Sequence, residues 1–219
     1  MQHDFILLDR SGSMRTLWNE AISSVNGYVS KLAADNVDTS ITLAVFDAPA
    51  TALDFNIIRD RIIPTTWKKV EPTEAEPRGW TPLNDAIGKI VDLAKAGAPG
   101  GVKYDKVAII IMTDGQENAS RELNTDQARK LLDDCRLMGW QVVFLGANFD
   151  NAAQAAGYGT QSRHTVRTSA VNLGATMSVM ADKRAIYGAT LGEVAAQSMN
   201  FSEDEKTQLS SDAPVTPDP

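Results

Sequence analysis

The sequence contains a single cysteine, Cys135, among its 219 residues. One cysteine cannot form a disulfide within its own chain, so the cysteine content does not indicate an oxidising compartment. Cys135 lies in a segment with a helical pattern, and we interpret it as a small core residue rather than a reactive thiol. The chain is therefore not a disulfide-stabilised scaffold.

Long apolar runs and basic runs are also absent. No apolar run approaches the roughly 18 residues that span a bilayer, and the first residues, MQHDFILLDR, lack the pattern of a secretory signal. The formal net charge is −7 and no Lys/Arg-rich run occurs, so nucleic acid and membranes are not expected partners. We expect a cytoplasmic protein. The chain also has no GxxxxGK[ST] loop, so any nucleotide hydrolysis would belong to a partner.

What the sequence does contain is an alternation of short apolar runs with helix-length amphipathic segments. This alternation predicts an α/β fold with a Rossmann-like, doubly wound and mostly parallel sheet. An alternating stretch at 51–58 follows a short turn, which predicts a hairpin and hence one antiparallel edge strand. The other expected strands are 5–8, 40–46, 107–112, 140–145 and 165–166, and the expected helices are 17–34, 82–95, 124–138 and 150–156.

The pattern changes after residue 169. Apolar residues recur at spacings of three and four, interrupted by Arg184, in the series Leu173, Met177, Met180, Tyr187, Leu191 and Val194. We predict a helix that packs this stripe on the sheet, with a self-association surface as the alternative. Three glycines in the segment predict a kink or break near Asp182. The predicted organisation is a domain at 1–168, a helical extension at 169–201 and a polar, disordered tail at 202–219.

Three segments bring oxygen-bearing side chains to one edge of the predicted sheet. Asp9-Arg10-Ser11-Gly12-Ser13 follows the first strand, Asp114 follows the central strand, and Thr81 begins the helix after a long loop. Because the carboxyl ends of parallel strands meet at one edge, where such folds place their sites, we expect these side chains to lie together.

Oxygen ligands without His or Cys are typical of a hard cation: magnesium, or alternatively manganese or calcium. Gly12 permits a tight turn between the two serines. We expect at least one of Asp9 and Asp114 to act through water, which leaves mostly neutral hydroxyls and water around the ion. The cation then keeps much of its charge and attracts an outside carboxylate. Such a site is a binding device, without an evident nucleophile or general base.

The segment DRSGS resembles the DxSxS signature of the von Willebrand factor A family, whose metal-ion-dependent adhesion site (MIDAS) also takes a threonine and an aspartate from later loops. GWTPLNDAI at 79–87 looks like the threonine loop, and MTDG at 112–115 looks like the aspartate loop. The resemblance covers about residues 3–168 and fills all five positions, with Asp9, Ser11, Ser13, Thr81 and Asp114. It implies a doubly wound sheet and adhesion or complex assembly through the metal. Without a signal or disulfides, the chain looks most like the intracellular prokaryotic or phage members.

Several further residues are expected near the metal. Trp80 replaces the glycine that often precedes the threonine of the family, which implies a bulkier rim that selects partners sterically. Asp85 is interpreted either as a hydrogen-bond partner of the DRSGS loop or as a favourable charge at a helix N-terminus. The remaining rim candidates are Arg10, Gly12, Gln116, Glu117 and Asn118. Asp47 is interpreted as a turn former.

These observations lead to three functional hypotheses. The first is a metal-dependent protein-binding module that grips an Asp or Glu carboxylate of a partner protein. The second is a self-assembling, homo-oligomeric protein that associates through the 173–194 stripe or through acidic residues of the tail. The third is a magnesium-dependent phosphatase of the haloacid-dehalogenase type, which we disfavour because Ser11 occupies the position where that chemistry needs a second carboxylate.

Overall fold

The computed structural model describes residues 1–147, 157–159 and 162–215. Its centre is a six-stranded sheet in the order β3-β2-β1-β4-β5-β6. All neighbouring strands are parallel except β3, which runs antiparallel to β2. The predicted α/β fold with one antiparallel edge strand is therefore confirmed. The strands are β1 (Gln2–Asp9), β2 (Ser40–Asp47), β3 (Asp54–Ile62), β4 (Lys106–Thr113), β5 (Gln141–Ala147) and β6 (Thr165–Thr168).

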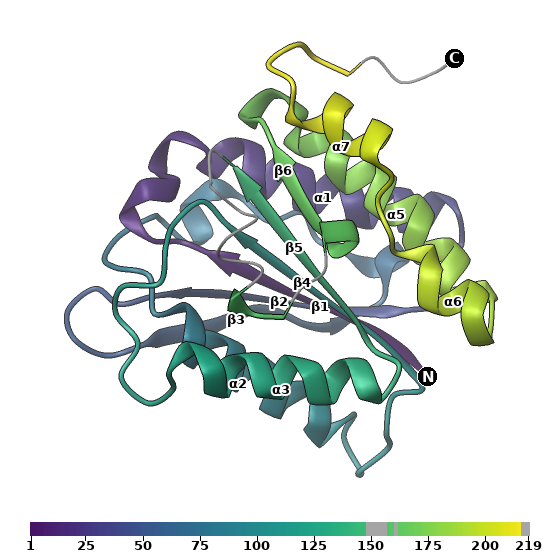
Figure 1. Cartoon of the computed structure of the whole chain (residues 1–219), viewed down its shortest axis with the longest axis horizontal. Coiled ribbons are helices and arrows are strands. Elements are labelled where there is room, and N and C mark those ends of the chain that lie inside the picture. Colours follow the sequence, from purple (N-terminus) through teal and green to yellow (C-terminus); the bar gives the residue numbers. More distant parts are fainter. Residues whose placement is uncertain (148–156, 160–161, 216–219) are drawn as a thin grey trace.

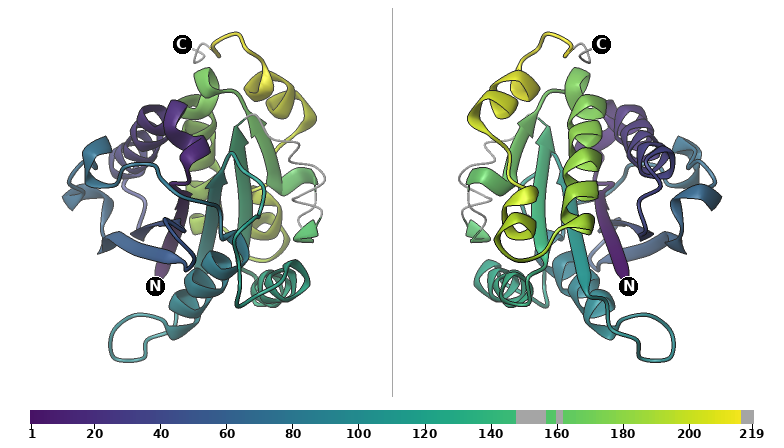
Figure 2. Two further views of the ribbon diagram at one scale, coloured as in Figure 1. Left: turned by 90° about the vertical axis from the view of Figure 1, so that its left-hand side faces the viewer. Right: turned by 90° about the vertical axis from the view of Figure 1, so that its right-hand side faces the viewer.

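Helices cover both faces of the sheet. Figure 1 shows α1 (Trp18–Ala34) and α5 (Leu173–Ala189) on one face, and α2 (Leu83–Ala96) and α3 (Thr125–Leu137) on the other. The side views in Figure 2 show the same two helical layers with the sheet between them. The continuous apolar run of β1 agrees with this arrangement, since successive side chains point to opposite faces and both faces are buried. None of the helices in the described part of the chain is long and apolar enough to cross a membrane.

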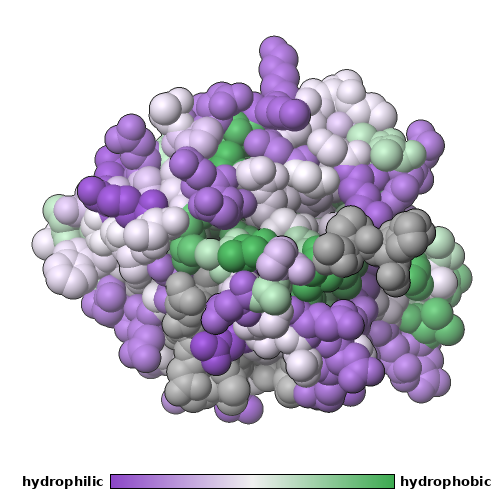
Figure 3. Space-filling model, turned by 90° about the horizontal axis from the view of Figure 1, so that it is seen from above, coloured by the Kyte–Doolittle hydropathy of each residue, from purple (hydrophilic) through white to green (hydrophobic). Residues whose placement is uncertain are grey.

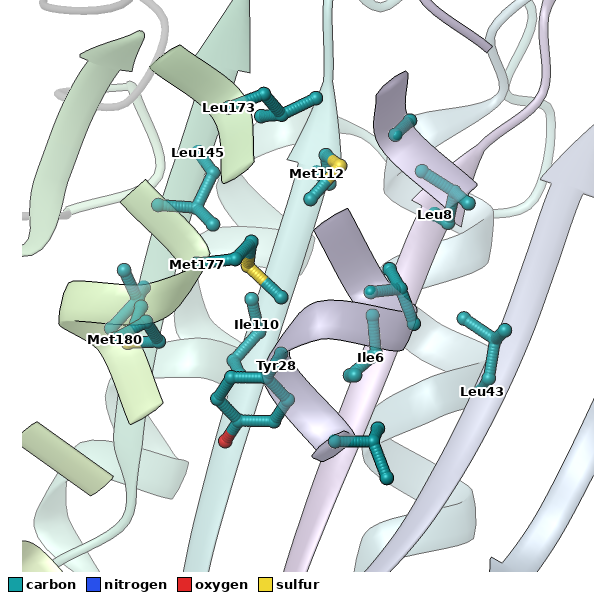
Figure 4. Close-up of a cluster of buried hydrophobic side chains, with 14 of the residues drawn as sticks. Ile6, Leu8, Tyr28, Leu43, Ile110, Met112, Leu145, Leu173, Met177 and Met180 are labelled. Atoms are coloured by element: carbon teal, nitrogen blue, oxygen red, sulfur yellow. The ribbon is translucent and has the colours of Figure 1, made fainter. Parts of the chain in front are cut away.

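The larger core lies between the sheet and the helices α1 and α5. In Figure 4, Tyr28 of α1 and Met177 and Met180 of α5 lie over the strand residues Ile110 and Leu145. All five side chains are completely buried. A second core on the other face includes Cys135 of α3, whose pKa burial raises to about 11, as expected for a core residue rather than a reactive thiol.

The C-terminal stripe is only partly buried. Leu173, Met177, Met180 and Tyr187 of α5 lie in the core, whereas Leu191 and Val194 are 81% and 60% exposed. The helix continues through Asp182, where we expected a break, because Arg184 is fully buried and its Nε donates to the carboxylate of Asp4 on β1. The break comes after Ala189, and the short helix α6 (Gly192–Ser198) follows. Seen from above, hydrophobic residues gather near the middle and at the right-hand edge, the side on which Figure 1 shows α6 (Figure 3).

A helix, α7 (Glu203–Ser210), replaces the disorder that we predicted from residue 202. Ser202 and Glu205 form a capping box at its start, and such boxes stabilise helix N-termini. Leu209 is 2% exposed, and Glu205 pairs with Lys183 of α5 at 2.9 Å. The prediction of disorder was wrong because it rested on the polar composition of the segment, which does not indicate contacts with residues distant in the sequence. The helix expected at 150–156 lies outside the described residues.

Candidate metal site

The site begins at Asp9, the last residue of β1, whose side chain is completely buried. Its Oδ1 accepts a hydrogen bond from the backbone N–H of Ser11 at 2.7 Å, and its Oδ2 accepts one from the Thr113 hydroxyl at 2.7 Å. Thr113 ends β4, so this hydrogen bond joins the carboxyl ends of two adjacent parallel strands. Nothing in the local sequence pattern identified Thr113 as part of the site.

The serines of the DRSGS loop connect Asp9 to the Asp114 segment. The hydroxyl oxygens of Ser11 and Ser13 lie 3.1 Å apart, and the Ser13 hydroxyl donates to Asp114 Oδ1 at 2.7 Å. A short 3₁₀ helix starts directly at Gly12 and turns the chain towards α1. The turn brings both serines to the same edge of the sheet as Asp114.

Thr81 approaches the same point from the third loop. A Cβ atom built on Gly115 would lie 3.2 Å from Thr81 Oγ1, 3.4 Å from Ser13 Oγ and 3.8 Å from Asp9 Oδ2. Oxygens of the DRSGS loop and of Thr81 therefore meet beside Gly115, where a larger residue would press a side chain against them, and Asp114 joins them through Ser13. The structure thus brings together all five side chains of the predicted metal site, Asp9, Ser11, Ser13, Thr81 and Asp114.

The electrostatics of this space favour a cation. Burial raises the pKa of Asp9 to about 6; hydrogen bonds from Thr113 and Ser11 counteract this rise, and the nearby Asp114 adds to it. Burial also raises the pKa of Asp114. Two desolvated carboxylates that share a site repel each other when both are ionised, and a positive ion between them removes that cost.

The donor set fits a hard divalent cation. In the described part of the chain, no group of three or more His, Cys, Asp or Glu side chains is placed to hold a metal. The oxygens gathered near Gly115 are instead three hydroxyls and two carboxylates, a set without nitrogen or sulfur ligands. Magnesium, manganese and calcium prefer oxygen ligands, and magnesium keeps several waters.

The predicted rim residues Glu117 and Asn118 hold the threonine loop in place. The Asn118 side chain accepts from the Thr81 N–H at 2.8 Å, and the Asn118 N–H donates to the Thr81 carbonyl at 3.1 Å. The Glu117 carboxylate accepts from the N–H of Asn84, in the first turn of α2, at 2.9 Å. Both residues therefore link the loop after β4 to the start of α2.

Asp85, in the first turn of α2, also connects the start of this helix to the segment that follows β4. Its carboxylate accepts three backbone N–H groups, from Arg121, Glu122 and Leu123, at 2.8 to 3.0 Å. These hydrogen bonds join Asp85 to the segment before α3 rather than to the DRSGS loop, and its position in the first turn of α2 agrees with the other interpretation, a favourable charge at a helix N-terminus. The residues that fix the loops are thus distinct from the metal-ligand candidates.

The other rim candidates differ in exposure. Trp80 is 61% exposed beside Thr81, and Gln116 is also exposed. Arg10 is only 6% exposed and pairs with Asp47 at 2.8 Å. Asp47, which we interpreted as a turn former, is the fully buried last residue of β2.

The family model of the von Willebrand factor type A domain matches residues 5–177. The chain belongs to this family. No curated protein sequence matches the chain. Von Willebrand factor A domains commonly mediate protein–protein adhesion and bind divalent metals, and a likeness to solved structures supports the same fold.

Three solved structures illustrate that likeness. Proximal thread matrix protein 1 from the mussel byssus has 16% identity and a TM-score of 0.58, over 82% of this chain and 46% of its own. The manganese-loaded TRAP protein of Plasmodium vivax has 17% identity and a TM-score of 0.56, over 79% and 70%. The von Willebrand factor domain of the type V pili tip protein Mfa5 from Porphyromonas gingivalis has 12% identity and a TM-score of 0.64, over 88% and 97%. The chain thus spans less than half of the mussel protein, and these identities establish the fold alone.

Proposed function

We propose that this von Willebrand factor A domain is a protein-binding module that grips an Asp or Glu carboxylate of a partner through a divalent cation. The observation that carries the proposal is the convergence of five oxygen-bearing side chains from three loops: three of them face Gly115, and the other two connect to them through Ser13. We assign Asp9, Ser11, Ser13, Thr81 and Asp114 to the cation, which we propose to be magnesium, with manganese or calcium as alternatives.

The chemistry of the donor set supports an attachment role. Three of the five side chains are neutral hydroxyls, and both Asp9 oxygens already accept hydrogen bonds from the protein. A bound cation would therefore retain much of its positive charge and attract a further anionic ligand. Ser13 is exposed while Ser11 is buried, so the site is open towards solvent on the Ser13 side.

We propose that the site is not an enzyme active site. A hydroxyl nucleophile is commonly activated by a neighbouring general base that takes its proton, and the carboxylate nucleophile of a haloacid-dehalogenase-type phosphatase needs a second carboxylate where this chain has Ser11. In the described part of the site, the two carboxylates accept hydrogen bonds from Ser11, Ser13 and Thr113, and no His or Lys lies among the assigned residues. A phosphatase activity that is lost in an Asp9→Asn variant would overturn this assignment.

Two of the solved structures with this fold offer parallels for metal binding and for a place at a pilus tip. The TRAP structure contains manganese, and Mfa5 is a pilus tip protein. For this chain, both metal binding and attachment to a partner are proposals that the site geometry supports. Self-association through Leu191 and Val194, which are exposed on or beside α6, is the second candidate.

The test has two stages. First, Mn²⁺ binding is measured by calorimetry for the wild type, Thr81→Ala and the matched control Thr16→Ala, which removes an exposed hydroxyl outside the cluster. We expect weakened binding only in Thr81→Ala. Second, partners are captured from the native extract with magnesium, with chelator, and with Thr81→Ala.

A partner that is retained only by wild-type protein with magnesium would support the metal-bridged mechanism. Equal retention in all three conditions would contradict it and direct attention to α6. Capture of the same chain alone, independent of metal, would favour self-assembly.

A further inference from the structure

Two arginines and two aspartates form an ion-pair cluster beside the metal loop. Arg10 belongs to the DRSGS segment itself, and Arg78 lies three residues before Thr81. Asp47 ends β2 with a fully buried side chain, and Asp54 begins β3 with a side chain that is 34% exposed. The cluster therefore brings together residues of both loops and of the strands at one edge of the sheet.

Asp47 joins the two arginines directly. Its Oδ1 accepts from Arg10 Nε at 2.9 Å and lies 2.8 Å from Arg10 Nη2, and its Oδ2 accepts from Arg78 Nε at 3.0 Å. Asp54 Oδ2 contacts Nη2 of both arginines, at 2.9 Å for Arg10 and more closely for Arg78. Each carboxylate thus bridges the metal loop and the threonine loop.

Backbone hydrogen bonds connect the same segments. The Arg78 N–H donates to the Arg10 carbonyl at 2.8 Å, and the Gly12 N–H donates to the Gly79 carbonyl at 3.1 Å. Gly79 has φ +67°, and a Cβ built on it would lie 2.3 Å from the Ala48 carbonyl oxygen. The chain before Thr81 is therefore pressed against both the metal loop and the end of β2.

We propose that Asp47 and Arg78 are positioning residues that hold the Thr81 loop against the DRSGS loop and thereby set the cation affinity of the site. The inference rests on the proposed metal binding and extends it to two residues that would not touch the ion. A buried carboxylate is a suitable bridge because two guanidinium groups can bind it in fixed directions. On the side of the loop away from Asn118 and Glu117, these ion pairs supplement the backbone hydrogen bonds that join the Thr81 loop to the DRSGS loop.

The direction in which Arg78→Ala changes the cation affinity distinguishes a positioning role from a purely electrostatic one. Removing the positive charge of Arg78 near a cation site should tighten cation binding if charge alone matters. Loss of positioning should instead weaken binding. Arg78 is suited to the test because its side chain is 48% exposed, and Asp47 and Asp54 both keep Arg10 as a partner in its absence.

The experiment measures Mn²⁺ affinity by calorimetry and electron paramagnetic resonance for wild type, Arg78→Ala, Thr81→Ala and the double variant. Arg15→Ala is the matched control, because Arg15 is exposed and, among the described residues, its guanidinium makes a single long hydrogen bond of 3.4 Å, to the Pro77 carbonyl. Urea unfolding in chelator confirms that each variant is folded. We expect Arg78→Ala to weaken Mn²⁺ binding about tenfold, in the range typical for residues that orient metal ligands, and Arg15→Ala to leave it equal or slightly tighter.

The double variant tests the route through Thr81. If Arg78 acts by placing Thr81, Arg78→Ala should have little further effect when Thr81 is already alanine. Additive losses, or an Arg78→Ala affinity equal to that of Arg15→Ala, would overturn the positioning role while leaving metal binding intact. Absence of Mn²⁺ binding by the wild type would instead refute the proposed function itself.

Discussion

Asp9→Asn should make the metal-free protein more stable, although it removes a residue from the centre of the site. Burial raises the pKa of Asp9 from 3.8 to about 6, so keeping it ionised costs free energy in the folded state. A rise of about two pKa units corresponds to about 3 kcal/mol. Asparagine removes this cost while its oxygen still accepts from the Ser11 N–H, and its amide can donate to the Thr113 hydroxyl.

The pH dependence identifies the cause. Because the folded pKa is raised, the cost is fully present above about pH 6 and disappears as the pH falls towards 3.8, where Asp9 becomes protonated in both states. We therefore expect Asp9→Asn to gain up to about 3 kcal/mol at pH 8 in chelator, or roughly 6 to 12 °C in Tm for a chain of this size. The gain in stability should nearly vanish as the pH approaches 3.8.

Urea unfolding in chelator at pH 8 and near pH 3.8 measures the gain in stability and its pH dependence. Repeating the titration at pH 8 with saturating magnesium measures the stabilisation by the metal. Magnesium should stabilise the wild type and leave Asp9→Asn unchanged. A variant that is less stable than the wild type at alkaline pH without metal would refute the reasoning, since it would mean that the hydrogen bonds to the carboxylate outweigh its desolvation.

Three further changes have definite expected outcomes. Arg184→Ala should lower the free energy of unfolding by about 3 to 5 kcal/mol in urea titrations, because it leaves Asp4 buried without its cation. Gly79→Ala should weaken Mn²⁺ binding and lower Tm, since alanine is strained at φ +67° and its Cβ would meet the Ala48 carbonyl; Gly100→Ala, also at positive φ but in open space, is its control and should retain affinity. Burial lowers the pKa of His3 from 6.5 to about 3, so the free energy of unfolding should decrease as the pH falls from 6.5 towards 3, because the unfolded chain takes up a proton that the folded chain does not. His3→Gln should make this decrease shallower in urea titrations over that pH range, and an equally steep decrease in both proteins would contradict the prediction.

The sequence was informative about the fold because its strongest signals are local. The apolar run of β4 indicates a buried strand, the hydroxyl-rich loop directly after β1 indicates a site at a strand end, and the parallel topology brings the two together. The helix α7 could not be predicted in this way. Its stability depends on Leu209 and on the pairing of Glu205 with Lys183, contacts between segments about 20 residues or more apart that no local pattern records.

The same difference separates the metal-ligand candidates from the residues that hold them. The five candidates are recognisable because their side-chain type reflects the chemistry of the ion. Asp47 and Asp85 carry the same side chain as two of the candidates, yet their carboxylates accept from arginines and from backbone N–H groups of other loops. Their role depends on which segments meet in space, so the sequence alone indicates a turn former for Asp47 and, for Asp85, either a partner of the DRSGS loop or a charge at a helix N-terminus. Ion affinity requires the three loops to lie at fixed distances from one another. We therefore expect substitutions of Asp47 or Asp85 to alter metal binding even though none of the five candidate ligands is itself substituted.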